Sequence, residues 1–101
     1  MTPKDPTAGW VVAVMVAAEE EPTPLRRYFA VGRPDQQRAE WAAVDAATAL
    51  GRVAASPVAG NEPVEAVAAL PGSLMKRMGL ADGAIRPLGE KLPRRWMIAG
   101  K

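Results

Sequence analysis

Cysteine and histidine are both absent from this sequence of 101 residues. The lack of cysteine excludes disulfide bonds, thiol nucleophiles and thiolate metal sites. The lack of histidine removes the commonest metal ligand and the commonest general base. Neither the phosphate-cradling motif nor the dinucleotide fingerprint, both rich in glycine, occurs in the chain. We therefore expect no enzymatic activity, no metal site and no cofactor.

Aromatic residues and long apolar runs are also scarce. Aromatic side chains make up 5% of the chain, so the core must be built from aliphatic side chains and methionine. The most apolar run, Trp10 to Ala18, has nine residues, whereas a membrane-spanning helix needs about 20. Asp5 and Pro6 precede this run, which departs from the pattern of a signal peptide. The sequence thus predicts a cytoplasmic protein without membrane contact.

The composition that remains is typical of a folded domain, with 49% hydrophobic and 24% charged residues. Ten prolines and nine glycines indicate short elements joined by turns. Arginine outnumbers lysine, a bias typical of GC-rich bacterial genes. We expect residues 1–9 to form a flexible N-terminal arm and residues 10–85 to form a single α+β domain. Residues 86–101 would then be a basic C-terminal tail or a docked edge segment.

The clearest local pattern predicts a helix over residues 35–50. Asp35 is a suitable N-cap, and Gly51 can take the left-handed conformation just beyond the end. At the helical period, one face carries a stripe of small apolar residues that can lie close against a sheet. This stripe consists of Ala39, Ala42, Ala43, Ala46, Ala49 and Leu50.

The segments around this helix predict a sheet of about three strands. Trp10–Ala18 and Leu25–Gly32 are rich in β-branched and aromatic residues, and a short connection between them favours an antiparallel hairpin. Val64–Leu70 is the better third strand, with the weakly extended residues 53–59 as the alternative. A short helix is expected over Pro71–Leu80, with Ser73 as N-cap. The fold class is therefore α+β, in the order β-β-α-β-α, with a predominantly antiparallel sheet and one main helix packed on one face.

The first two strands lack the alternation of an antiparallel sheet with one wet face. Val12, Val14 and Val16 point one way, and the residues between them are also apolar. Both faces of the sheet therefore need cover, and one helix can cover only one of them. We expect the C-terminal segment or a second molecule to cover the other.

Trp41 and Val44 are the large apolar residues of the helix, and they share a row with Gln37 and Thr48. Two interpretations are open. A terminal segment or loop covers Trp41 within the chain, or else Trp41, Val44 and Thr48 belong to an interface, since aromatic residues are enriched in interface cores. Together with the two-sided strands, the second interpretation predicts a small non-enzymatic interaction module. It would self-associate as a homodimer or bind a protein partner.

Nucleic-acid binding is the alternative function, because charge is unevenly distributed. Residues 1–50 carry five basic and seven acidic groups, a net charge of −2, and residues 51–101 carry eight basic and four acidic groups, a net charge of +4. Basic side chains with one stacking aromatic residue are typical of phosphate-binding surfaces. The residues that would form such a basic strip are Lys76, Arg77, Arg86, Lys91, Arg94, Arg95 and Trp96.

Overall fold

The computed structural model describes residues 6–17, 24–57, 60 and 62–89. In this part of the chain, a five-stranded antiparallel sheet packs with two helices. The α+β class and the antiparallel sheet expected from the sequence are thus confirmed. In chain order the elements are β1 (Thr7–Ala17), β2 (Leu25–Val31), α1 (Gln36–Thr48), β3 (Arg52–Val53), β4 (Val64–Pro71), α2 (Gly72–Met78) and β5 (Ile85–Gly89).

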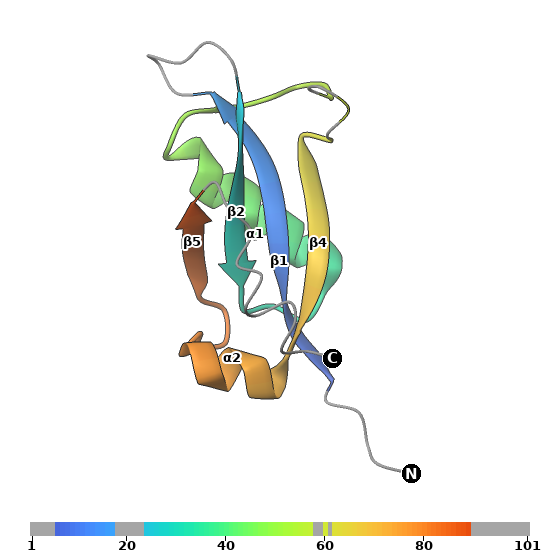
Figure 1. Ribbon diagram of the computed structural model, residues 1–101, viewed down its shortest axis with the longest axis vertical. Helices are drawn as coiled ribbons and strands as arrows, with labels where there is room; N and C mark the ends of the chain where they lie inside the picture. The colour runs from blue at the N-terminus through green and yellow to red at the C-terminus, as the bar shows by residue number, and fades with distance from the viewer. Residues whose placement is uncertain (1–5, 18–23, 58–59, 61, 90–101) are drawn as a thin grey trace.

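Strand β1 is the centre of the sheet (Figure 1). It pairs antiparallel with β2 on one side and with β4 and β3 on the other, and β5 extends the sheet beyond β2. A strand with both edges paired and both faces covered is apolar throughout. Val11, Val12 and Val14 accordingly have no exposed surface. The predicted hairpin and the third strand over Val64–Leu70 are both present.

The sheet has five strands where about three were expected, and the order is β-β-α-β-β-α-β. Both additional strands lie at sheet edges, where pairing needs little sequence pattern. Strand β3 has two residues, and β5 contains Pro87, which a central strand would not accept. The first strand also begins at Thr7, so residues 7–9 belong to the sheet and not to an N-terminal arm.

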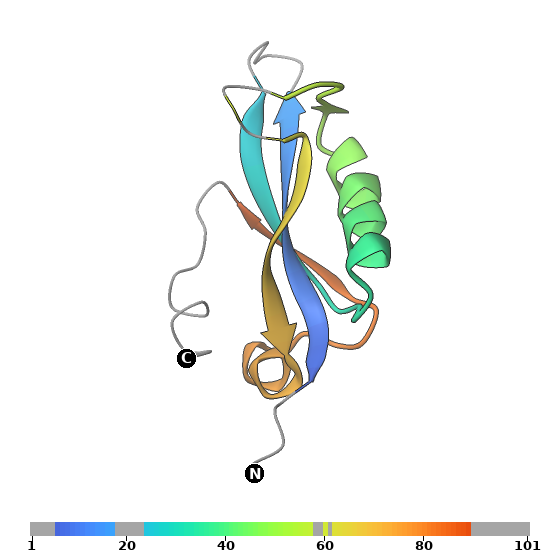
Figure 2. The ribbon, with the colours of Figure 1, turned by 90° about the vertical axis from the view of Figure 1, so that its right-hand side faces the viewer.

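Helix α1 covers one face of the sheet (Figure 2). Its predicted N-cap is present, because Asp35 Oδ2 accepts a 2.9 Å hydrogen bond from the Arg38 backbone N–H. The buried stripe differs from the expected one: Ala49 and Leu50 follow the last helical residue and are exposed, and Ala47 is buried. The residues that form this half of the core are Val12, Val14, Val16, Phe29, Val31, Ala39, Ala43 and Ala47.

The opposite face is covered at one end by α2, an element that the sequence did not assign to this role. Leu74, Met75 and Met78 pack there with Val11 and Leu70. Helix α2 begins at Gly72, so Ser73 lies inside the helix and is not its N-cap. The N-cap residue is Pro71, which makes no side-chain capping hydrogen bond. The large aliphatic and methionine side chains of this short helix close the second half of the core.

Gly51 follows α1, but it does not take the left-handed conformation expected of it. The C-cap residue is Ala49, in right-handed geometry. A Cβ built on Gly51 would lie 2.4 Å from the carbonyl oxygen of Ala17. Glycine is therefore needed at this position because two backbone segments come into close contact, and not because of a left-handed turn.

Candidate functional site

An apolar groove lies between α1 and the β4 edge of the sheet, with a volume of about 340 Å³. Figure 1 shows α1 crossing behind the sheet as far as β4. We call this surface the edge groove. Its lining residues are Gln37, Glu40, Trp41 and Val44 of α1, Val53 of β3 and Val64 of β4.

The helical period explains how the edge groove forms. Ala39 and Ala43 have no exposed surface and hold α1 against the sheet. Residues at positions 37, 41 and 44 then line the flank beside β4, because spacings of three and four residues place them on one side of the helix. Trp41 is 62% exposed, and Val44 is half-buried. Within the part of the chain that the structure describes, no segment covers the Trp41 indole.

Trp41 and Val44, two of the three predicted interface residues, lie together in the edge groove. The third, Thr48, is exposed, but it does not line the groove, and its hydroxyl donates to the Asp45 carbonyl at 2.7 Å. Sequence reasoning missed Val53 and Val64, the two sheet residues of the groove. They come from separate segments that meet only because β3 and β4 pair with the same side of β1.

Beside the edge groove, the first residues of β4 present backbone groups that no other described residue binds. The Met15 N–H donates to the Pro63 carbonyl at 2.8 Å. The backbone groups of Met15 therefore point from β1 toward the side on which β4 lies. Backbone N–H and C=O groups alternate in direction along a strand, so those of Ala13, two residues before Met15, also point toward β4 and bond to Glu65. The backbone groups of Val64, the neighbour of Glu65, therefore point away from β1.

Ala66 follows the same alternation as Val64, so its N–H and carbonyl also face outward. Among the described residues, no backbone partner for these outward groups is found. Val64 thus contributes both a free hydrogen-bonding edge and an apolar wall of the groove. A backbone edge next to a side-chain pocket is the arrangement that binds extended peptides by strand addition.

The charged residues around this edge are mainly acidic. Glu40 lines the groove, and Glu62 and Glu65 lie on either side of Val64 in the sequence. Glu65 pairs with Arg26 at 2.9 Å across β1, and this pair is partly exposed. Because Arg26 neutralises Glu65, the negative charge beside the groove is that of Glu40 and Glu62, which favours a basic partner.

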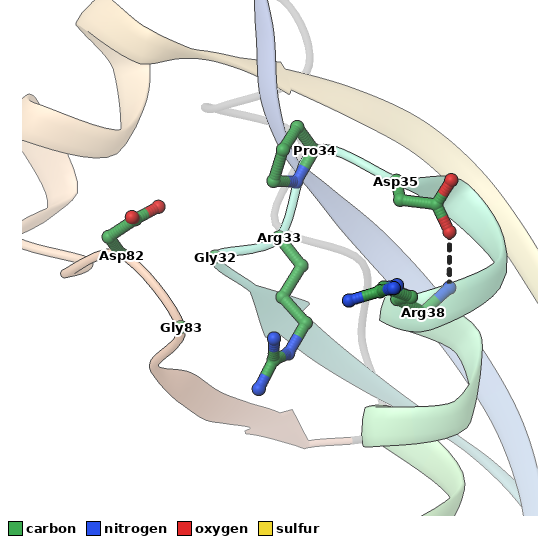
Figure 3. A pocket seen from close by; sticks show the side chains of 7 residues that line it. All are labelled: Gly32, Arg33, Pro34, Asp35, Arg38, Asp82 and Gly83. Atoms are coloured by element: carbon green, nitrogen blue, oxygen red, sulfur yellow. Dashed lines mark hydrogen bonds between the residues drawn. The ribbon is translucent and has the colours of Figure 1, made fainter.

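A second pocket, of about 320 Å³, lies between the segment that precedes α1 and the turn that precedes β5. Figure 3 shows Arg33 and Arg38 on one side and Asp82 on the other. Asp35, which also lines the pocket, caps the helix. All four charged side chains are exposed, and their charges cancel. This pocket therefore favours no particular class of ligand.

The predicted basic strip is only partly assembled in the described residues. Lys76 and Arg77 are exposed on the last turn of α2. The Arg86 guanidinium instead donates to the carbonyls of Met78 and Gly79, where it satisfies the C-terminal end of α2. The remaining strip residues, Lys91, Arg94, Arg95 and Trp96, lie outside the described residues.

Comparisons with protein-family models, curated proteins and solved structures find no match for this chain. Over the described ranges, no cluster of three or more acidic side chains is placed to hold a metal ion. In the same part of the chain, neither helix is long and apolar enough to cross a membrane. The assignment of function therefore depends on the chemistry of the edge groove.

Proposed function

We propose that this chain is a small, non-enzymatic protein-interaction module that self-associates, with the edge groove as part of the interface. The observation that supports it is Trp41, 62% exposed beside the half-buried Val44 and Val64. Burying the exposed part of an indole, on the order of 150 Å², contributes about 4 kcal/mol before the costs of association.

A second copy of this chain is the partner that we favour, on grounds of symmetry. Homo-oligomers with two-fold symmetry are the commonest assemblies, and in them each copy contributes the same surface. Gln37 and Glu40 form a polar rim around Trp41, and Thr48 continues that rim along α1, as interface anatomy requires. A homodimer in the cytoplasm, as the sequence predicts, remains part of this proposal.

The test is the molar mass in solution, measured by size-exclusion chromatography with light scattering. We expect a dimer for the native chain and a monomer for Trp41→Ala. Leu50→Ala is the matched control, because Leu50 is 47% exposed but lies outside the groove, and it should remain dimeric. Circular dichroism of each variant checks that the fold is retained.

The proposal is contradicted if the native chain is monomeric, or if Trp41→Ala lowers stability without changing the mass. The 260/280 nm absorbance ratio across the same peak tests the alternative function. A raised ratio that falls at high salt would favour nucleic-acid binding instead.

A further inference from the structure

We infer that the edge groove receives the C-terminal segment of a second copy, residues 90–101, and that the part of it after Pro93 adds as a strand on β4. This inference rests on the self-association proposed above and names the segment that binds. Residues 90–101 lie outside the described residues, so the inference combines their sequence with the geometry of the groove.

The backbone of β4 favours strand addition at this edge and not at the other. Val64 and Ala66 direct their N–H and carbonyl groups outward, and no proline interrupts β4 before its last residue, Pro71. Strand β5, the opposite edge, contains Pro87, which has no N–H to donate. Proline is one of the devices by which edge strands avoid pairing. A β-bulge lies between Ala66 and Ala68, so the part of the β4 edge that can accept a strand is its beginning, Val64 to Ala66.

The side chains of the groove require apolar residues in the incoming strand. Alternate residues of a strand point to the same face, so one face of the added strand would meet Trp41 and Val44. The sequence Trp96-Met97-Ile98 supplies two large apolar side chains at that spacing, Trp96 and Ile98. In this chain, that cluster is the apolar one closest to the C-terminus.

The charges of the two surfaces are complementary. Glu40 lines the groove and Glu62 precedes β4, whereas Glu65 is already paired with Arg26. Residues 90–101 carry four basic groups and one acidic group, a net charge of +3. Arg94 would share a strand face with Trp96, which places it toward Glu40. Such pairs speed association and fix the register.

The segment is long enough to span the full width of one sheet. Twelve residues in extended conformation reach about 40 Å. The three strand spacings from β5 to β4 amount to about 14 Å. Because each copy can give one segment and receive one, reciprocal exchange closes the dimer and leaves no unfilled groove.

The first experiment blocks the outward edge of β4. Ala66→Pro removes an N–H that faces away from β1, so it spares the β1–β4 hydrogen bonds. We expect a monomer by light scattering, with circular dichroism close to that of the native chain. Ala66→Ser keeps the N–H and should remain dimeric. A dimeric Ala66→Pro of native-like spectrum overturns the inference.

The second experiment exchanges charges across the interface. Glu40→Arg and Arg94→Glu should each raise the dimer dissociation constant by about tenfold or more, measured by analytical ultracentrifugation. The double variant should recover the native value, because the pair is restored with its signs reversed. Unchanged constants in both single variants, or no recovery in the double variant, would overturn the inference.

The two proposals can fail separately. If Trp41→Ala is monomeric but the Ala66 and Arg94 variants remain dimeric, the groove mediates self-association and the added strand is refuted. If the native chain is monomeric, both proposals are refuted.

Discussion

Substituting Gly51 distinguishes two reasons for a glycine after a helix. A glycine that is kept for a left-handed turn accepts asparagine better than alanine, since asparagine tolerates that conformation. A glycine that is kept for close packing accepts neither, because both residues carry a Cβ. The structure assigns Gly51 to the second class, since its backbone is not left-handed.

The magnitude follows from the contacts that a Cβ would make at Gly51. It would lie 2.4 Å from the Ala17 carbonyl oxygen, 2.9 Å from the Ala17 carbonyl carbon and 3.1 Å from Val16 Cγ1. Two of these neighbours are backbone atoms, so the end of β1 must shift, and its pairing with Arg52 with it. Overpacking of this kind costs about 1–3 kcal/mol. Reduced entropy of the unfolded chain offsets roughly 0.4–1 kcal/mol of that cost.

Urea unfolding followed by circular dichroism measures the effect, at one fixed protein concentration because association would alter the midpoint. We expect Gly51→Ala to lose about 1–2 kcal/mol and Gly51→Asn to lose at least as much. Gly83 is the control, with a φ of +79° and no atom within 4 Å of a built Cβ. There asparagine should be tolerated better than alanine. If asparagine is also the milder substitution at Gly51, the close-packing explanation is refuted.

Two further predictions concern the ends of the helices. Asp35→Ala removes the acceptor of the Arg38 N–H and should lower the free energy of unfolding by about 1 kcal/mol in urea, whereas Asp35→Asn should keep most of it. Equal losses in both variants would contradict a capping role. Arg86→Gln should lose about 1.5–3 kcal/mol, because its guanidinium donates to the Met78 and Gly79 carbonyls. A stability equal to that of the native chain would show that water replaces these bonds at no cost.

The elements that sequence reasoning predicted are those whose signals are local. The signals for α1 lie within one continuous stretch of chain: Asp35 marks its start, and the alanine-rich run that follows favours a helical interior. The hairpin of β1 and β2 is also local, because a short connection leaves few other pairings. Local patterns were therefore sufficient for these elements, including the N-cap bond.

The features that were missed depend on contacts between distant segments. Strand β3 has two residues and exists because β1 extends beyond the start of β4, which leaves Val16 and Ala17 free to pair. For the same reason Val53 and Val64 could not be assigned to one groove before the topology was known. The role of Gly51 was also non-local, since its close neighbour is Ala17.

The two-sided apolar pattern of β1 has a further consequence for function. It required cover on both faces, and among the described residues α1 covers one face and α2 covers one end of the other. The features that the described residues leave for binding are the flank of α1 with Trp41 and the outward backbone of Val64. An edge site of this kind binds through main-chain hydrogen bonds as well as apolar contact, so we expect its partner to be an extended segment. We therefore expect proline at Ala66 and alanine at Trp41 each to abolish self-association, the first by removing a main-chain donor and the second by removing the apolar contact.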